Sequence, residues 1–416
     1  MHRFAPACRS LLLAGALGLA VPAGAQSPPD GAASAAAAPT RLQRIEALRA
    51  QRPNDGLLVY YQALALIEAG RRDEAYALLR SLVGRGLGIV PAQGIGFEPV
   101  WDDAEFQGVR RQLAADEART APAPVAFALR ERLLVPEGIA WDAQGRRFFL
   151  GSLPGHRLIE RDAQGRERSF STPGDRLDAV LGLAVDAPRG RLCAVSTNGF
   201  EASGKAQRRN AVVCWALADG KRLARYEAPA ALQFNDLAFG ADGTIFVTDS
   251  EAGSLWRVRP GDAAPSLVGA PGALRGANGL AVLPGREAVY VAISTGIARV
   301  DPQTAELQRL AQPDSVVSGA IDGLYAWRGH LVGIQNATSP GRVVRLDLAP
   351  DGRSIVGAAT LQSHHHPEFD EPTTGAPVGD ALFVIANSSV GRYQPDGSLR
   401  DAASIRAARV IAVPLR

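Results

Sequence analysis

The sequence predicts an all-β six-bladed β-propeller, preceded by a small α-helical segment at the N-terminus. The first observation behind this prediction is a short motif that recurs six times, as PEGIAWD, LGLAVD, FNDLAF, ANGLAV, IDGLYAW and PTTGAPVGD. The copies are 43 to 54 residues apart when they are aligned on Gly138, Gly182, Asp236, Gly279, Gly323 and Gly375. A period of about 40–50 residues, with several strands in each unit, is typical of a β-propeller blade. The second observation is a change from helical to strand periodicity near residue 120.

Each repeat has the pattern of a four-stranded antiparallel blade. In NDLAF–GADG–TIFVTDS, at residues 235–250, an apolar strand is followed by a turn rich in Asp and Gly and then by a β-branched strand. The last repeat ends with RVIAVPLR, which supplies only its third strand. We expect PVAFALRE, at residues 124–131, to supply the fourth strand, because this pairing closes the ring and covers two sheet edges. The propeller is therefore predicted over residues 124–416.

Residues 41–118 are predicted to be helical. Apolar residues recur at helical spacing from Leu42, Ala63–Val83 has the pattern of two helices broken at Gly70, and a further helix is predicted over Asp103–Glu117. The segment resembles a tetratricopeptide-type helix pair. Such a pair either recruits a protein partner or serves as a cap docked on the propeller, and the pattern is compatible with both.

The N-terminus has the features of a secretory signal peptide over residues 1–25. Arg3 and Arg9 supply positive charge, Leu11–Val21 is a short apolar run, and small residues precede a cleavage site after Ala25. Residues 26–40 are rich in Ala, Pro and Ser and are predicted to form a flexible linker. We therefore expect a periplasmic or secreted protein, and no later apolar run is long enough to span a bilayer.

Composition argues against a nucleic-acid partner. The net charge is only +3 over 416 residues, and the basic residues are dispersed rather than gathered into runs with interleaved aromatic residues.

Two cysteines remain after removal of the signal peptide. Cys193 and Cys214 are predicted to lie on neighbouring strands of the second blade, in an oxidising compartment. A cross-strand disulfide and a pair of buried free thiols are both compatible with this placement. A metal-binding role is not indicated, since neither a CxxC pair nor a suitably spaced histidine accompanies them.

Four polar residues occupy the same slot of four different repeats, directly before the alignment point. They are Glu137, Asn235, Asn278 and Asp322. In a propeller the same slot of each blade returns to the same radius and height, so we expect these side chains to converge near the axis. Two carboxylates and two amide oxygens suit a hard divalent cation, with Ca²⁺ favoured and Mg²⁺, Mn²⁺ or Zn²⁺ also compatible. The alternative is that they satisfy backbone groups at strand ends, as Asn and Asp often do in turns.

The motifs PEGIAWD, FNDLAFGADGTIFVTDS, ANGLAVLPGREAVYVA and IDGLYAW resemble, in order and spacing, those of the gluconolactonase/regucalcin (senescence marker protein) family. More distantly they resemble those of paraoxonase-type lactonases. The resemblance covers Leu134–Leu331 well, the last blade weakly and the helical segment not at all. It implies a six-bladed propeller with one divalent metal on the axis and hydrolysis of lactones.

The resemblance also implies roles for individual residues. The metal ligands of the family fall on Glu137, Asn278 and Asp322, and the residue beside both metal and substrate falls on Asn235. Related enzymes often carry Arg two residues before that Asn, where this chain has Gln233. We expect Gln233 and Asn235 to contact the substrate.

The histidine run at residues 364–366 precedes the last blade and has no counterpart in the family pattern. We expect it in a loop at the same mouth of the propeller as the metal, with His365 contacting the substrate. A solvated loop is the alternative.

Together these features predict an exported metal-dependent hydrolase of the lactonase or esterase type, acting on a small lactone or ester. In this hypothesis the metal polarises the carbonyl group for attack by water, and Asp322 is the general base. Motifs of other hydrolases, such as GxSxG and HExxH, do not occur. The alternative is a non-enzymatic propeller scaffold or ligand-binding protein with a structural metal.

Overall fold

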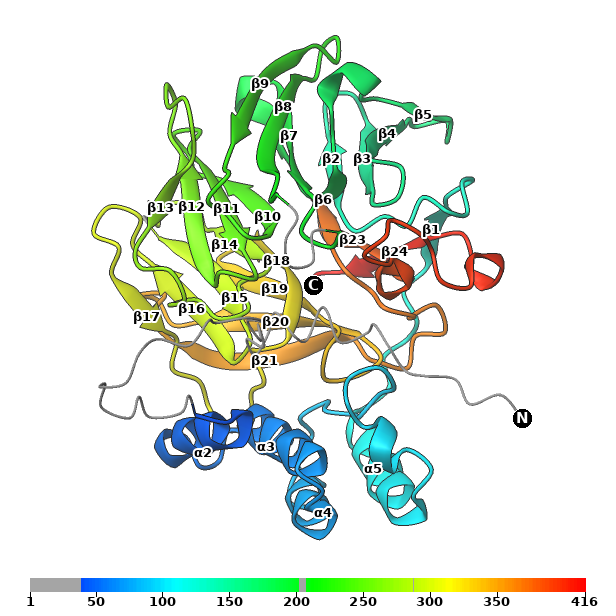
Figure 1. The fold of residues 1–416 in the computed structure, drawn as a ribbon, viewed down its shortest axis with the longest axis vertical. Coiled ribbons are helices and arrows are strands. Elements are labelled where there is room, and N and C mark those ends of the chain that lie inside the picture. Colours follow the sequence, from blue (N-terminus) through cyan, green and yellow to red (C-terminus); the bar gives the residue numbers. More distant parts are fainter. Residues whose placement is uncertain (1–38, 202–206, 287) are drawn as a thin grey trace, which may run out of the picture.

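The computed structural model describes residues 39–201, 207–286 and 288–416. The predicted signal peptide and nearly all of the predicted linker lie outside these residues. The described chain contains six four-stranded antiparallel sheets, with helices before the first of them (Figure 1). The innermost strands of successive sheets contact one another in a closed ring, β2–β6–β10–β14–β18–β22 and back to β2. The predicted six-bladed propeller is confirmed.

Strands follow chain order from the axis outward in the first three blades. Blade 1 contains β2 (Ile139–Asp142), β3 (Arg147–Ser152), β4 (Arg157–Arg161) and β5 (Glu167–Ser169). Blade 2 contains β6 (Ala179–Asp186), β7 (Arg191–Thr197), β8 (Asn210–Ala216) and β9 (Arg222–Glu227). Blade 3 contains β10 (Phe234–Phe239), β11 (Ile245–Asp249), β12 (Ser254–Val258) and β13 (Ser266–Val268).

The next two blades repeat this order, and the last one departs from it. Blade 4 contains β14 (Leu280–Val282), β15 (Val289–Ile293), β16 (Gly296–Val300) and β17 (Leu307–Arg309). Blade 5 contains β18 (Ile321–Trp327), β19 (His330–Gln335), β20 (Arg342–Leu348) and β21 (Ile355–Gln362). Blade 6 contains β22 (Gly375–Val378), β23 (Ala381–Ile385), β24 (Arg409–Pro414) and, outermost, β1 (Val125–Ala128).

The predicted ring closure is also present. β1 pairs antiparallel with β24, with Val125 opposite Ile411 and Ala128 opposite Arg409. The first strand of the propeller thus completes the last blade, which leaves fewer exposed sheet edges.

Glycines directly after the slot residues allow the inner strands to approach closely. A Cβ atom at Gly138 would lie 2.0 Å from the carbonyl oxygen of Leu181, and one at Gly279 would lie 2.3 Å from that of Asp322. Only a residue without a side chain fits this contact. These two glycines therefore bring Glu137 and Asn278 close to the next blade.

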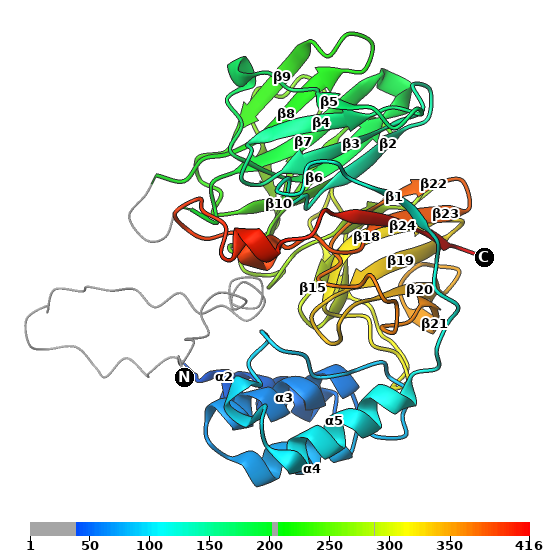
Figure 2. The same cartoon turned by 90° about the vertical axis from the view of Figure 1, so that its right-hand side faces the viewer.

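The N-terminal helices form a separate layer beside the propeller (Figure 2). They are α2 (Arg41–Gln51), α3 (Gly56–Glu68), α4 (Arg72–Arg80) and α5 (Ala104–Asp116), with a 3-10 turn η1 (Glu98–Val100) before α5. The side chains of Asp55 and Asp103 accept hydrogen bonds from the first backbone N–H groups of α3 and α5, which fixes where these helices begin. We call residues 41–116 the helical layer.

The helical layer is joined to the propeller by both apolar and polar contacts. Val317, from the loop before β18, belongs to the same buried apolar cluster as the helices. The N–H of Val90 donates to the carbonyl of Thr338 at 2.7 Å, and the hydroxyl of Tyr61 donates to the carbonyl of Ser294 at 3.1 Å. The layer is thus held against blades 4 and 5.

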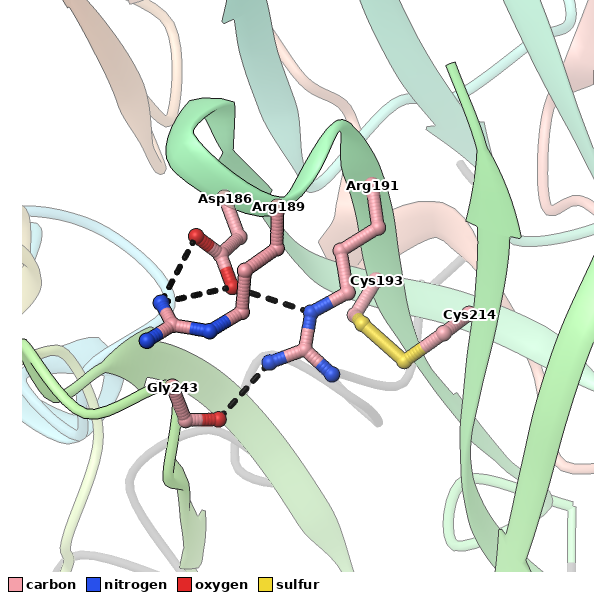
Figure 3. The surroundings of a disulfide bond; sticks show 6 residues. All are labelled: Asp186, Arg189, Arg191, Cys193, Cys214 and Gly243. Carbon is pink, nitrogen blue, oxygen red and sulfur yellow. Dashed lines mark hydrogen bonds and ion pairs between the residues drawn. A yellow bond between two sulfur atoms is a disulfide. The ribbon is translucent and has the colours of Figure 1, made fainter. Parts of the chain in front are cut away.

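Cys193 and Cys214 form a disulfide (Figure 3). They lie directly opposite each other on β7 and β8, and both are buried. Close by, Arg191 donates from Nε to Asp186 at 2.9 Å and from Nη2 to the carbonyl of Gly243, on the next blade, at 2.7 Å. Of the two states that the sequence left open, the structure contains the bonded one.

Across the described residues, every helix is too short or too polar to cross a bilayer.

Candidate metal centre

The four slot residues come from four different blades. Glu137 and Asn278 directly precede the glycines that lead into β2 and β14, whereas Asn235 and Asp322 are the second residues of β10 and β18. Glu137, Asn235 and Asp322 are buried, with exposed fractions of 4%, 3% and 2%.

Electrostatic interactions link the slot residues across the blades. The side chain of Asn278 lies near the carboxylate of Asp322 and lowers its pKa, and the charge of Asp322 raises the pKa of Glu137. Asn235 and Asn278 line the same cavity. The structure therefore gathers these residues in one region, as the shared slot predicts.

Three of the four side chains present a buried oxygen without a hydrogen-bond partner among the described residues. These atoms are Glu137 Oε2, Asn235 Oδ1 and Asp322 Oδ1. A buried acceptor without a partner costs about 1–3 kcal/mol. Three such oxygens, all hard donors and all from the starts of inner strands or the residues just before them, fit a divalent cation that binds oxygen ligands.

Neighbouring groups hold these oxygens in place. The amide nitrogen of Asn235 donates to Ser250 Oγ at 2.8 Å, which leaves its carbonyl oxygen as the unpartnered atom. Asn336 donates from Nδ2 to Asp322 Oδ2 at 2.6 Å and to the carbonyl of Pro372 at 2.9 Å. Sequence reasoning missed Asn336 because it lies at the end of a second strand, outside the repeated motif.

Burial and mutual repulsion raise the pKa of the acidic groups here. Burial, then the charges of Asp322 and Asp236, hold the pKa of Glu137 well above its usual range. Burial raises the pKa of Asp322 to about 6, although hydrogen bonds from Asn336 and Asn278 lower it. Crowded buried carboxylates of this kind are stable only with protons or a cation between them.

Asp236 is a third acid that the sequence did not indicate as functional, because it occupies the alignment point itself. Burial raises the pKa of Asp236 to about 7, although hydrogen bonds from the backbone N–H groups of Leu237 and Leu280 lower it. Its Oδ1 accepts from the N–H of Leu237 at 2.8 Å. Asp236 therefore adds negative charge to the region while its own oxygen is engaged.

Asn235 and Asn278 open onto a cavity of about 200 Å³. On the propeller side its wall includes Gln233, Ser250 and Asn336, so both Gln233 and Asn235 lie where the sequence predicted substrate contacts. The wall is completed by residues of the helical layer, which the sequence did not predict.

His365 is not among the described residues that line this cavity. Its Nδ1 lies 3.2 Å from Ser363 Oγ, and its ring lies 3.8 Å from that of His364. The structure therefore places His365 at the junction with the helical layer, beside Glu117 and His364.

His364 and His365 gather with Glu117 at the junction between the helical layer and the propeller. Potential ligand atoms of the three lie within 4.8 Å of one another. Both carboxylate oxygens of Glu117 are already engaged, Oε1 by Arg342 at 3.0 Å and Oε2 by His364. The cluster is explained as a structural junction rather than as a second metal site.

Comparisons with known proteins give similarity only at the level of structure. No family model matches the chain, and no curated protein matches it. A gluconolactonase from Xanthomonas campestris aligns at 19% identity and a TM-score of 0.46, over 71% of this chain and 96% of its own. A calcium-binding regucalcin from Agrobacterium tumefaciens aligns at 16% identity and a TM-score of 0.47, over 71% and 98%.

The PQQ-bound aldose sugar dehydrogenase from Streptomyces coelicolor aligns equally well, at 15% identity and a TM-score of 0.47, over 71% of this chain and 99% of its own. Since proteins of different chemistry align to the same degree, these similarities do not select an activity. The chain is similar in structure to a gluconolactonase and to a regucalcin, as its sequence motifs indicate.

Proposed function

We propose that the protein is an exported, metal-dependent hydrolase of the lactonase or esterase type. The observation that carries the proposal is the set of three buried, unpartnered oxygens on Glu137, Asn235 and Asp322 beside a cavity. With Asn278, these residues would hold a divalent cation, with Ca²⁺ favoured because all the donors are hard oxygens. When bound, such a cation polarises an ester carbonyl and stabilises the negative charge that develops during hydrolysis.

Asp322 is the proposed general base. Its Oδ2 accepts from Asn336, and its Oδ1, which has no partner among the described residues, is the oxygen that would meet the cation and a water bound to it. In the proposed step, water forms a bond to the carbonyl carbon and Asp322 takes its proton. The ring C–O bond then breaks, and the leaving oxygen receives the proton, which gives a hydroxy acid.

In this proposal, Asn235 positions the substrate or completes the set of metal ligands. Ser250 fixes its amide nitrogen and in turn donates to the carbonyl of Ala277, directly before Asn278. The two Asn residues of the site are thereby coupled through a short hydrogen-bond chain. Glu137 acts mainly as a ligand.

The cavity wall favours a neutral, hydroxylated substrate. Its described residues include no Arg, Lys or His, but they include several carboxamide side chains, namely Gln93, Gln233, Asn235, Asn278 and Asn336. Carboxamides donate and accept hydrogen bonds and so suit hydroxyl groups. Asp370 and Glu371 also line the wall, and their acidity disfavours an anionic ligand. Because the sequence motifs resemble those of the gluconolactonase family, a neutral sugar lactone is the first substrate to test.

Export is part of the proposal and rests on the predicted signal peptide. The Cys193–Cys214 disulfide agrees with an oxidising compartment.

The competing function is a binding protein or scaffold in which a metal only pins the blades together. The helical layer, with its tetratricopeptide-like sequence pattern, would then recruit a protein partner.

Metal analysis followed by a lactone screen separates these functions. The expected result is a bound divalent cation and hydrolysis of D-glucono-1,5-lactone that a chelator abolishes. Asp322→Ala should abolish turnover and weaken metal binding, whereas Asp314→Ala, at an exposed acid, should change neither. Hydrolysis retained in Asp322→Ala would remove this residue from the chemistry. A protein that keeps its metal but is inert towards lactones and esters would be a scaffold.

A further inference from the structure

The helical layer contributes to the wall of the cavity that the metal centre faces. Tyr61 of α3 and the segment Ala92–Ile95, between α4 and η1, line the same cavity as Asn235 and Asn278. A substrate bound against the inner strands therefore also meets residues that do not belong to the propeller.

The Ala92–Ile95 segment is held in one conformation by its own surroundings. The carboxylate of Glu98 accepts hydrogen bonds from the N–H groups of Gly94 and Gly96, the latter at 3.1 Å. Both glycines have positive φ, 83° and 106°, in the region that glycine adopts most easily. The turn is thus built around one acidic side chain.

The same segment is fixed at its start against the propeller. The N–H of Val90 donates to the carbonyl of Thr338, next to the wall residues Ala337 and Ser339. The carbonyl of Pro91 accepts from Nε of Arg110 on α5 at 2.9 Å. Tyr61 reaches the carbonyl of the wall residue Ser294. A segment with anchors on both sides of the junction presents its side chains at a defined place.

Gln93 and Ile95 are the side chains of this segment that offer most to a ligand. Gln93 is exposed, lines the cavity and carries both a hydrogen-bond donor and an acceptor. Ile95 is half-buried and packs against the apolar cluster of the helical layer. One polar and one apolar side chain on a rigid turn are the elements of a selective wall.

We propose that the Ala92–Ile95 turn determines substrate specificity, with Gln93 contacting the hydroxyl groups of a neutral lactone. The helical layer is then part of the substrate site. This inference rests on the proposed function for the cavity and goes beyond it, because the proposed chemistry uses propeller residues alone.

The test compares Gln93→Ala and Gln93→Trp with Gln112→Ala and Gln112→Trp. Gln112 is an exposed glutamine of α5, outside the cavity wall, and so controls for the residue type and for the layer. With Ca²⁺ present, two sets of values are measured for each variant: kcat and KM for D-glucono-1,5-lactone and for unsubstituted δ-valerolactone, and the affinity for D-glucono-1,5-lactam by calorimetry. The Ca²⁺ affinity is measured separately, by titrating Ca²⁺ into protein that has been depleted of metal with a chelator. The lactam is a probe of the same shape that resists hydrolysis.

Loss of one ligand hydrogen bond should weaken binding of the gluconolactone and the lactam about 3- to 10-fold in Gln93→Ala. Because δ-valerolactone has no hydroxyl groups, its KM should change less than about twofold. Gln93→Trp should weaken binding of the larger ligands by at least as much, since its bulk occupies the cavity. Ca²⁺ affinity and both Gln112 variants should match the parent.

Each outcome bears on a different proposal. If the parent binds the lactam but hydrolyses nothing, the hydrolase proposal fails, and the lactam affinities still decide the role of Gln93. If the parent hydrolyses the lactones and the Gln93 variants behave like the Gln112 variants, the specificity role is wrong while the hydrolase stands. If the parent binds neither lactone nor lactam, the turn has no such ligand and the inference is overturned.

Discussion

Asn336 donates a hydrogen bond from Nδ2 to Oδ2 of Asp322 at 2.6 Å, and Oδ1 of the same carboxylate has no hydrogen-bond partner among the described residues. The two oxygens of this buried carboxylate therefore differ: Oδ2 is held in place by a hydrogen bond, and Oδ1 is not. A second bond from Asn336 to the carbonyl of Pro372 ties the arrangement to the segment that leads into β22, the first strand of the last blade. The position of Asp322 thus depends on contacts that span blades 5 and 6.

Asn336→Ala should therefore impair the site without removing a proposed ligand. A hydrogen bond to a carboxylate favours its ionised form, so its loss raises the pKa of Asp322 and lets protons compete with the cation. Such a bond is worth about 1.5–3 kcal/mol, which corresponds to a roughly 10- to 100-fold loss of Ca²⁺ affinity. The loss should be larger at pH 6 than at pH 8, as measured by calorimetric titration.

The exposed Asn54→Ala is the matched control and should bind Ca²⁺ as the parent does at both pH values. An equal loss for Asn336→Ala at pH 6 and pH 8 would mean that Asn336 acts on packing and not on the charge of Asp322.

Without bound metal, the protein should become less stable as the pH rises. The pKa values of Asp322 and Asp236 are about 6 and about 7 in the fold, above their ordinary value near 3.8. The folded protein therefore holds more protons than the unfolded chain between about pH 4 and pH 7, and stability falls as pH rises through this window. The loss is on the order of a few kcal/mol, at about 1.4 kcal/mol for each pKa unit.

Thermal unfolding at pH 5 and pH 8 tests this expectation, with chelator and with excess Ca²⁺. In chelator the Tm should be lower at pH 8, and Ca²⁺ should remove most of the difference. Asp322→Asn should show a weaker pH dependence in chelator. If the Tm in chelator is higher at pH 8 than at pH 5, the pKa values of Asp322 and Asp236 are not raised in the folded protein.

The sequence indicated the propeller and all four proposed ligands because both follow the repeat. A residue such as Asn278 takes its position from the blade it opens, so equal slots imply equal positions. The closure of the ring by Val125–Ala128 was predictable for a similar reason, since the last repeat lacks its outer strand. Polar residues outside the repeat carry no such signal, and Asn336 and Asp236 were missed.

The role of the helical layer was not predictable from its own residues. Gln93 lies in a glycine-rich turn without helical periodicity, and nothing local indicates that it faces a cavity formed by blades 3 to 6. Its position depends on long-range contacts such as Val90 with Thr338, which join segments about 250 residues apart. The surroundings of His365 were not predictable either, because long-range packing places it beside Ser363, His364 and Glu117.

Glu117→Gln should destabilise the junction between the layers. Arg342 is buried, and its Nη1 lies 3.0 Å from Glu117 Oε1. The variant leaves a buried guanidinium without a counter-charge, which costs about 3–5 kcal/mol in comparable pairs. Glu105→Gln, in an exposed pair with Arg80, should cost less than about 1 kcal/mol. Urea unfolding followed by circular dichroism measures both.

The same pair should make the junction sensitive to acid. Burial opposes ionisation of Glu117, but hydrogen bonds from His364 and Arg342 outweigh it and lower the pKa to about 2. A depressed pKa contributes stability above the unfolded value near 4.5, and this contribution is lost as pH falls towards 2. Glu117→Gln should lack this acid-dependent part. Parallel acid-unfolding curves for parent and variant would show that the pair is not coupled to folding.

Replacing both Cys193 and Cys214 by Ala should lower the free energy of unfolding by about 2–4 kcal/mol, the usual contribution of a disulfide. Both residues are buried on adjacent strands of blade 2, which supplies none of the four proposed ligands. Ca²⁺ affinity should therefore remain within about twofold of the parent, because sites that share no direct partner behave nearly independently. A large loss of Ca²⁺ affinity would indicate that blade 2 positions the centre.

Gln233→Arg should widen the range of substrates to lactones that carry a carboxylate. Gln233 lines the cavity next to Asn235, and the described wall has no cation to pair with a negative ligand. A guanidinium at this position can bind a carboxylate through two parallel hydrogen bonds. We expect kcat/KM for an anionic lactone to rise about tenfold or more relative to D-glucono-1,5-lactone, since a charged hydrogen bond is worth about 1.5–3 kcal/mol.

Gln112→Arg adds the same charge to an exposed site on α5 and separates a local effect from general attraction of anions. Any gain that it shares with Gln233→Arg should disappear as salt screens the surface charge, whereas a contact inside the cavity is screened much less. If both variants favour the anionic lactone equally at high salt, Gln233 does not face the bound substrate. The proposed preference for a neutral ligand would then rest on repulsion of anions by Asp370 and Glu371, on the loop before blade 6.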